Sequence, residues 1–152
     1  MEKRTLTMQQ MAEFVISTID AGGTCQLVVT GPSMSPTLQP VRDSVYLTAI
    51  RDRSFKKGDI VFYRRDCDHY VLHRIVKRKK DGTYGLNGDG QTQIEWIQKE
   101  QILAVVTAFE RKGKNVPVQS LRYRLYVQIW MRLRRFRKFF LRWNQWLSKT
   151  DF

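Results

Sequence analysis

The sequence predicts a mainly β domain with a helix at each end. Its 152 residues are enough for one compact domain with a hydrophobic core and too few for two. Short apolar runs separated by turn residues fill the middle of the chain, and a helical periodicity appears at both ends. We therefore expect a β-rich domain with a short N-terminal helix over residues 1–118 and a basic amphipathic helix over residues 119–150.

The first predicted element is a short amphipathic helix over residues 7–21. Its apolar residues recur at steps of three and four positions: Met8, Met11, Ala12, Val15 and Ile19. Thr7 followed by Gln10 fits a capping box, and Gly22 fits a helix stop. We expect this helix to pack on the domain rather than to read DNA, because no second helix follows at helix-turn-helix distance.

A series of short β-strands is predicted between residues 24 and 111. Six β-branched and aromatic runs follow one another: CQLVVT, SVYLTAI, DIVFYRR, YVLHRIVKR, TYGLN and ILAVVTAFER. Turn-forming segments such as KKGD, KKDG and NGDG lie between them, and Asp81-Gly82 is a predicted hairpin turn. The pattern favours an antiparallel sheet that ends near residues 114–117, where Gly, Lys, Asn and Pro cluster.

The C-terminal segment predicts one long, basic, amphipathic helix. Its apolar residues advance by three or four positions: Leu125, Ile129, Leu133, Phe136, Phe140, Trp143 and Leu147. Residues 111–150 contain twelve Lys or Arg and no Asp or Glu, so the net charge of +13 belongs to this segment. Such a helix fits an anionic membrane surface, an acidic protein or the chain's own sheet; the tryptophans disfavour nucleic acid.

Cysteine usage and hydropathy indicate a cytoplasmic protein. Cys25 and Cys67 lack metal-binding spacing, and neither a metal nor a cofactor is implied. No stretch reaches the roughly 18 to 20 apolar residues that cross a bilayer, and the N-terminus has no apolar run of signal-peptide length. We expect a cytoplasmic location, with peripheral attachment to the inner membrane surface as an option.

Two short motifs contain residues suited to nucleophilic catalysis. Ser33 lies in TGPSMSPTL, where Gly31 permits unusual backbone torsions and Pro32 fixes one. A hydrolytic serine needs a base and an oxyanion site, and it usually lies on such a constrained turn. His73 lies in the apolar run VLHRIV, on the side of the strand that Ile75 shares. The structural alternatives are that Gly-Pro and Ser-Pro simply shape a loop around Ser33, and that His73 is hydrogen-bonded within a sheet without a catalytic role.

The order and spacing of SMSPTL, KKGDIVFY, VLHRIV and LNGDG resemble the type I signal peptidases and the related LexA-type self-cleaving repressors. The resemblance covers roughly residues 24–108 and implies a β-rich serine peptidase domain in which Ser33 is the nucleophile. Gly31 stands where many leader peptidases have a serine that assists the oxyanion hole, so the hole would depend on backbone amides. The chain resembles a soluble member of this clan, without the N-terminal membrane anchor.

The resemblance also implies a base and a residue that orients it. VLHRIV is similar to the histidine variant of the eukaryotic and archaeal-type signal peptidases, which implies His73 as the general base. Other members use a lysine, for which Lys77 is the alternative here. Asp89 in the GD box of LNGDG is then implied to orient His73 and to stabilise the imidazolium, with Glu95 as the alternative.

The function that the resemblance implies is that of a serine endopeptidase. Ser33 would attack a peptide carbonyl, and water activated by His73 would hydrolyse the acyl-enzyme. A leader-like peptide is the expected substrate, because members of the clan cut after small residues. The rival is a catalytically silent module of the same fold that docks a membrane or protein partner through residues 119–150. A self-cleaving regulator is disfavoured, because no DNA-binding domain precedes the β-rich region.

Overall fold

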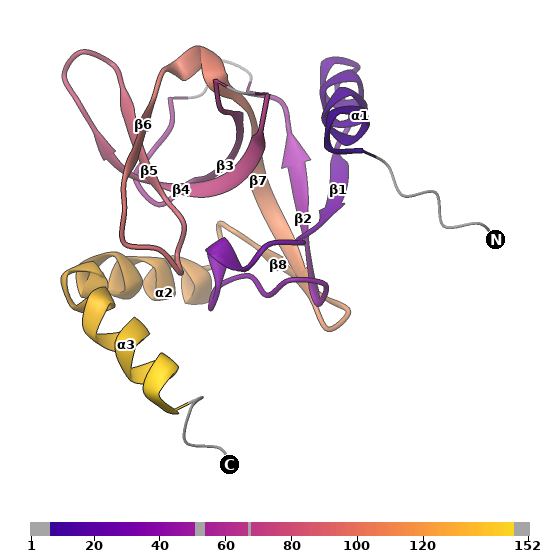
Figure 1. Cartoon of the computed structure of the whole chain (residues 1–152). Coiled ribbons are helices and arrows are strands. Elements are labelled where there is room, and N and C mark those ends of the chain that lie inside the picture. The colour runs from indigo at the N-terminus through magenta and orange to yellow at the C-terminus, as the bar shows by residue number, and fades with distance from the viewer. Residues whose placement is uncertain (1–6, 51–53, 67, 148–152) are drawn as a thin grey trace.

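The computed structural model describes residues 7–50, 54–66 and 68–147, and it has the predicted mainly β architecture (Figure 1). One antiparallel eight-stranded sheet forms the body, with helix α1 (Met8–Asp20) near one end of the chain and helical segments at the other. Cys67 lies outside the described residues, and Cys25 is a buried free thiol.

All six predicted runs form strands of the sheet, and two further strands lie where none was predicted. The strands are β1 (Cys25–Val28), β2 (Asp43–Thr48), β3 (Ile60–Arg64), β4 (Tyr70–Arg78), β5 (Tyr84–Asn87), β6 (Glu95–Ile97), β7 (Ile102–Arg111) and β8 (Lys114–Pro117). Their order in the sheet is β1-β2-β7-β3-β4-β5-β6, with β8 paired to β7. The unpredicted strands are β6 and β8. Figure 1 shows that the sheet curls strongly around β3 and β4.

Local sequence signals account for the ends of several elements. The hydroxyl of Thr7 accepts a hydrogen bond from the Gln10 amide at 3.2 Å, and the Gln10 side chain accepts one from the Thr7 amide at 3.0 Å. This is the predicted capping box at the start of α1. In the turn between β4 and β5, Gly82 has φ 91°, a left-handed conformation that glycine adopts without strain, so the predicted hairpin is confirmed.

The two faces of the sheet bury different apolar clusters, as strand alternation requires. One cluster joins the sheet to α1 and to the C-terminal segment, and it contains Leu72 and Met34. The other cluster lies within the curl and contains Ile75 and Tyr63. His73 lies on the side of Ile75, as predicted, whereas its neighbour Arg74 points to the opposite side.

The C-terminal segment is helical as predicted, with one difference. Helix α2 (Leu121–Arg132) is followed by a 3₁₀ turn, η3 (Leu133–Phe136), and by helix α3 (Arg137–Leu147), so the chain changes direction instead of forming one straight helix (Figure 1). Residues 148–150 of the predicted helix lie outside the described residues. Among the described residues, no helix combines the length and the apolar character needed to cross a membrane.

Helix α2 packs on the sheet through a face that differs from the predicted apolar stripe. Tyr123 and Val127 are its buried residues, and both belong to the cluster that α1 also joins. Leu125 and Ile129 of the stripe are instead exposed. The interpretation that the stripe packs on the chain's own sheet is therefore wrong for α2. The aromatic face bearing Tyr123 makes that contact, because its hydroxyl also finds a buried hydrogen-bond partner.

Candidate functional site

Ser33 lies on a short turn that buried neighbours hold in place. The turn is the 3₁₀ helix η1 (Pro32–Met34), which follows β1 and lies beside β4. Met34 and Leu38 are buried in the core on either side of the cis peptide bond between Ser35 and Pro36. The side chain of Ser33 is half-buried, and within the described residues its hydroxyl makes no hydrogen bond. The Ser33 hydroxyl therefore has no competing partner.

The loop after β5 packs directly against this turn. The Gly90 amide donates a hydrogen bond of 2.8 Å to the Ser33 carbonyl oxygen. A Cβ atom on Gly88 would lie 2.5 Å from the same oxygen, and one on Gly90 would lie 3.0 Å from the Ser35 carbonyl oxygen. These distances leave no room for a side chain on Gly88, so the glycines of LNGDG permit the approach of two backbones. The two sequence motifs therefore meet in space.

His73 occupies a buried position on β4, opposite Val61 of β3. Its Nδ1 atom lies 3.0 Å from the Tyr63 hydroxyl, and that hydroxyl donates to Glu95 Oε2 at 2.7 Å. Because the single proton of the hydroxyl goes to Glu95, the Tyr63 oxygen accepts a hydrogen bond from Nδ1–H of His73. This arrangement selects the tautomer in which Nε2 has a free lone pair.

Arg65 fixes the far end of this chain of hydrogen bonds. Its Nε and Nη2 atoms donate to the two carboxylate oxygens of Glu95, each at 2.8 Å. Although burial alone would raise the pKa of Glu95, hydrogen bonds from Arg65 and Tyr63 hold that pKa below its usual value. Burial and the carboxylate raise the pKa of Tyr63. At neutral pH the tyrosine is therefore protonated and the glutamate is ionised.

Burial and a neighbouring cation keep the His73 imidazole neutral. The pKa of His73 is lowered from 6.5 to about 4, first by desolvation and then by the positive charge of Arg65. The negative charges of Glu95 and Asp89 oppose this shift. At neutral pH the ring is therefore able to accept a proton at Nε2.

Asp89 has partners other than His73. Its carboxylate forms a two-pronged pair with Arg74, with Nε to Oδ1 at 2.8 Å and Nη2 to Oδ2 at 2.6 Å, and both side chains are fully buried. Thr37 donates a third hydrogen bond to Oδ2 at 2.5 Å. Asp89 thus acts on His73 through its charge, while the hydrogen bond to His73 comes from Tyr63. Of the predicted orienting residues, Glu95 is the one linked to His73 by hydrogen bonds.

The Arg74–Asp89 pair also attaches the C-terminal helices to the site. Arg74 donates from Nη1 to the Gly58 carbonyl at 2.8 Å and to the Tyr123 hydroxyl at 3.2 Å. Burial alone would lower the pKa of Arg74, but the charge and the hydrogen bonds of Asp89 raise it, so the guanidinium is charged. A buried arginine with four hydrogen-bonded contacts is satisfied by its surroundings. Its role in the described structure is structural.

Two cavities adjoin the candidate residues. One, of about 590 Å³, is lined by His73, Glu95 and Gly90. The other, of about 160 Å³, is mostly apolar and is lined by Ser33 together with Met11 and other side chains from α1, β1 and β4. Gly90 links the two, because it lines the first cavity and donates to the Ser33 carbonyl.

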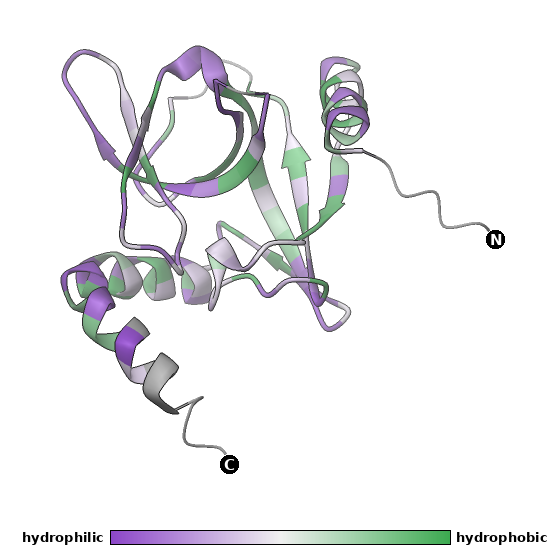
Figure 2. Ribbon diagram, in the orientation of Figure 1, coloured by the Kyte–Doolittle hydropathy of each residue, from purple (hydrophilic) through white to green (hydrophobic). Residues whose placement is uncertain are grey.

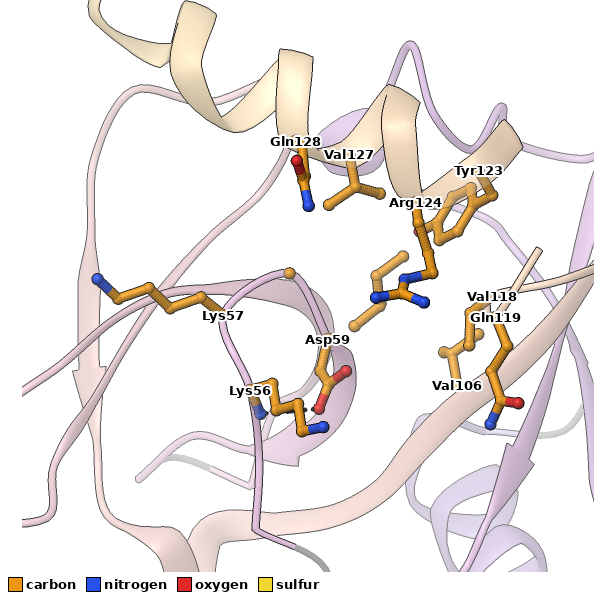
Figure 3. Close-up of a pocket in the computed structure, with 12 residues that line it drawn as sticks. Lys56, Lys57, Asp59, Val106, Val118, Gln119, Tyr123, Arg124, Val127 and Gln128 are labelled. Atoms are coloured by element: carbon orange, nitrogen blue, oxygen red, sulfur yellow. Dashed lines mark hydrogen bonds between the residues drawn. The ribbon is translucent and has the colours of Figure 1, made fainter. Parts of the chain in front are cut away.

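A third cavity, of about 440 Å³, lies elsewhere, between the loop before β3 and helix α2 (Figure 3). Arg124 points from α2 into it, and Lys56 and Asp59 border it on the loop, where the Lys56 amide donates to the Asp59 carboxylate at 2.9 Å. Neither Ser33 nor His73 lines this cavity. It is therefore separate from the candidate site.

Hydrogen bonds thus connect His73 to Glu95, whereas Ser33 lies on a turn beside β4 and lines the other cavity. Two residues that were not predicted complete the hydrogen-bonded chain. Tyr63 and Arg65 both lie in the predicted run DIVFYRR. The pairing of that run with VLHRIV could have pointed to Tyr63, because it places Tyr63 opposite Val71 and on the same face as His73. Lys77, the alternative base, is exposed near the end of β4. Within the described residues, no group of three or more His, Cys, Asp or Glu side chains could hold a metal.

Comparison with known proteins adds no further support. No protein-family model matches the chain, and no curated protein matches it either. The sequence motifs and the geometry of the site are therefore what indicate a function.

Proposed function

We propose that the protein is a serine endopeptidase of the signal peptidase and LexA type, with Ser33 as nucleophile and His73 as general base. The observation that carries this proposal is the neutral, buried His73, whose Nδ1–H is directed to Tyr63 and whose Nε2 is left as an acceptor. A base prepared in this way, on the strand beside a constrained serine turn, supplies two of the groups that nucleophilic catalysis uses.

The chemistry assigns a role to each group. His73 Nε2 takes the hydroxyl proton as the Ser33 oxygen attacks the peptide carbonyl, and it then gives that proton to the leaving amine. The resulting imidazolium still donates from Nδ1 to Tyr63, and the negative charge of Glu95 behind the tyrosine stabilises it. Ser33 lies in the first turn of η1, where amide groups lack acceptors within the helix, so its N–H is available to the developing oxyanion.

The surroundings of Ser33 favour an extended peptide with a small or medium apolar side chain. Strand β1 ends the sheet in the described part of the chain, so its free edge can pair with a substrate strand. The apolar cavity of about 160 Å³ beside Ser33 has room for such a side chain. Both features suit the leader-like substrate expected from the sequence.

A catalytically silent binding module is the second candidate, and one observation favours it. No hydrogen bond joins Ser33 and His73, although both lie within the described residues. A silent module needs no such bond, whereas a peptidase would have to form it when substrate binds, as catalytic hydrogen bonds often do. The reactivity of Ser33 distinguishes them.

The test is labelling of the full-length protein by a serine-directed activated acyl probe across a pH range. We expect labelling in the wild type and in Ser35→Ala, and its loss in Ser33→Ala and His73→Gln. Ser35 is a matched control because it lies on the same turn and bonds only to neighbouring groups. The rate should rise with pH through about 4, the pKa of His73, and not through 6.5. A wild type no more reactive than Ser33→Ala would refute the peptidase proposal in favour of the binding module.

A further inference from the structure

The C-terminal helices expose an unusual share of apolar surface. Eight of the thirteen large apolar side chains that are exposed in the described part of the chain lie on α2, η3 and α3: Leu121, Leu125, Ile129, Leu133, Phe136, Phe139, Phe140 and Trp143. They follow one another at steps of three or four residues or lie side by side. These eight side chains, which lie before, within and after the change of direction at η3, are here called the outer face. Figure 2 shows hydrophobic residues interleaved with hydrophilic ones along these helices.

The opposite side of the same segment is fixed to the domain. Tyr123 bonds to Arg74, as described above, and the Tyr126 hydroxyl lies 2.8 Å from the Thr37 hydroxyl. At the start of α3, Arg137 is 2% exposed, stacks over the Trp130 ring at 5.0 Å and donates to Asn87 Oδ1 at 2.5 Å. These contacts orient the helices, so the outer face cannot turn inward without breaking them.

Positive charge surrounds the outer face. Apart from Arg124, which points into the third cavity, the exposed cations of the segment are Arg122, Arg132, Arg135, Lys138 and Arg142. Residues 111–150 contain no acidic residue that could neutralise them. The outer face is therefore an apolar and aromatic stripe bordered by cations.

We infer that the outer face lies flat on an anionic lipid surface. A bilayer interface accepts both parts of this face, because acyl chains bury the Leu and Phe side chains while anionic headgroups pair with Arg and Lys. A second copy of the chain would bring two uncompensated cationic segments together, which charge repulsion opposes. Nucleic acid would pair with the cations and leave the apolar stripe in water.

Binding in this orientation would hold the candidate active site near the headgroups. Figure 1 shows α2 directly beside η1 and the loop after β5. The contacts of Tyr126 with Thr37 and of Arg137 with Asn87 make the same connection. A substrate at the membrane surface would then be close to Ser33. The membrane inference itself does not depend on peptidase activity, because vesicle binding is measured without it.

The test is co-sedimentation of the full-length protein with two kinds of vesicle, phosphatidylcholine alone and an equal mixture with phosphatidylglycerol. We expect binding to the mixed vesicles, weakened by added salt, and little binding to phosphatidylcholine. Phe136→Ser should weaken binding about tenfold through lost apolar burial. The loss of each cation should weaken binding to the mixed vesicles roughly fivefold. The double variant Arg135→Glu, Lys138→Glu should therefore bind at least about 25-fold more weakly.

Matched variants control for net charge and for surface hydrophobicity. Phe14→Ser alters an exposed ring on α1, where Phe14 is 57% exposed against 60% for Phe136. The pair Lys80→Glu and Lys99→Glu changes the net charge equally at exposed sites elsewhere. Both controls should bind mixed vesicles like the wild type. The inference would be overturned if the protein bound neither vesicle type or bound both equally, or if the variants and the controls lost vesicle binding to the same extent. Binding to an acidic protein or to nucleic acid without vesicle binding would also overturn it.

Discussion

The hydrogen bond from His73 to Tyr63 gives the sharpest prediction, through the variant Tyr63→Phe. The change removes one oxygen and leaves the ring, so the packing of β3 is retained. Glu95 keeps its hydrogen bonds from Arg65, but Nδ1–H of the buried His73 loses its acceptor. An unsatisfied buried donor costs about 1 to 3 kcal/mol, and we expect the free energy of unfolding to fall by that amount.

The same loss should slow catalysis, because nothing then selects the tautomer with Nε2 free. A penalty of about 1 to 3 kcal/mol in the transition state corresponds to a rate lower by roughly fivefold to 150-fold. The assay is the rate of acylation of Ser33 by the activated probe at pH 7. Probe affinity should change little, because Tyr63 lies behind the imidazole and lines neither cavity at Ser33 or His73.

Tyr46→Phe provides the matched control. The Tyr46 hydroxyl donates to Glu110 Oε2 at 3.0 Å on β2, so the variant also removes a tyrosine–carboxylate hydrogen bond, at a distance from His73 in the sheet. It should leave the acylation rate unchanged. If folded Tyr63→Phe acylates within about twofold of the wild type, the role assigned to Tyr63 is wrong.

Two further predictions concern stability. Arg74→Met should lower the free energy of unfolding by about 3 to 5 kcal/mol in urea titrations, because it leaves the Asp89 carboxylate buried without its cation. Adding Asp89→Asn to this variant should recover part of the loss. A loss below about 1 kcal/mol for Arg74→Met would contradict this account. As the pH is lowered from 6.5 to about 4, His73 becomes protonated in the unfolded chain and stays neutral in the folded one. The free energy of unfolding therefore decreases by about 3 kcal/mol over this range. His73→Gln should lack this component, and parallel pH profiles for the two proteins would refute it.

The sequence was sufficient for most of the fold because its signals are local. β4 and β7 have the predicted bounds, since both are long, β-branched runs ended by turn residues. β6 and β8 are only three and four residues long. β6 pairs with the preceding strand β5, and β8 pairs with the preceding strand β7. Such short segments have too few positions to show alternation. The 3₁₀ turn η3 was also invisible, because its apolar spacing continues the helical pattern on both sides.

The proposed nucleophile and base could be singled out in the sequence, and the residues that contact the base could not. Ser33 and His73 stand out because a constrained serine turn and a histidine in an apolar strand are both unusual. Tyr63 and Arg65 do not, because an aromatic and a cation are ordinary members of a strand. Which of Asp89 and Glu95 is linked to His73 depended on which of the two carboxylates Arg74 would form an ion pair with. That pairing arises from the opposite orientations of neighbouring side chains on β4 and from the approach of the loop after β5.

Because His73 and Arg74 are consecutive and point to opposite sides of β4, the histidine and the GD box that pairs with Arg74 carry different information in other sequences. The GD box is tied to Arg74 and to the helices behind it, so a descendant that had lost catalysis would still need that aspartate to remain folded. Its presence reports an intact scaffold. Under the proposed mechanism, activity depends on a histidine at position 73 together with Tyr63 and Glu95. A related sequence that lacks any of the three and keeps the GD box is then expected to fold without peptidase activity.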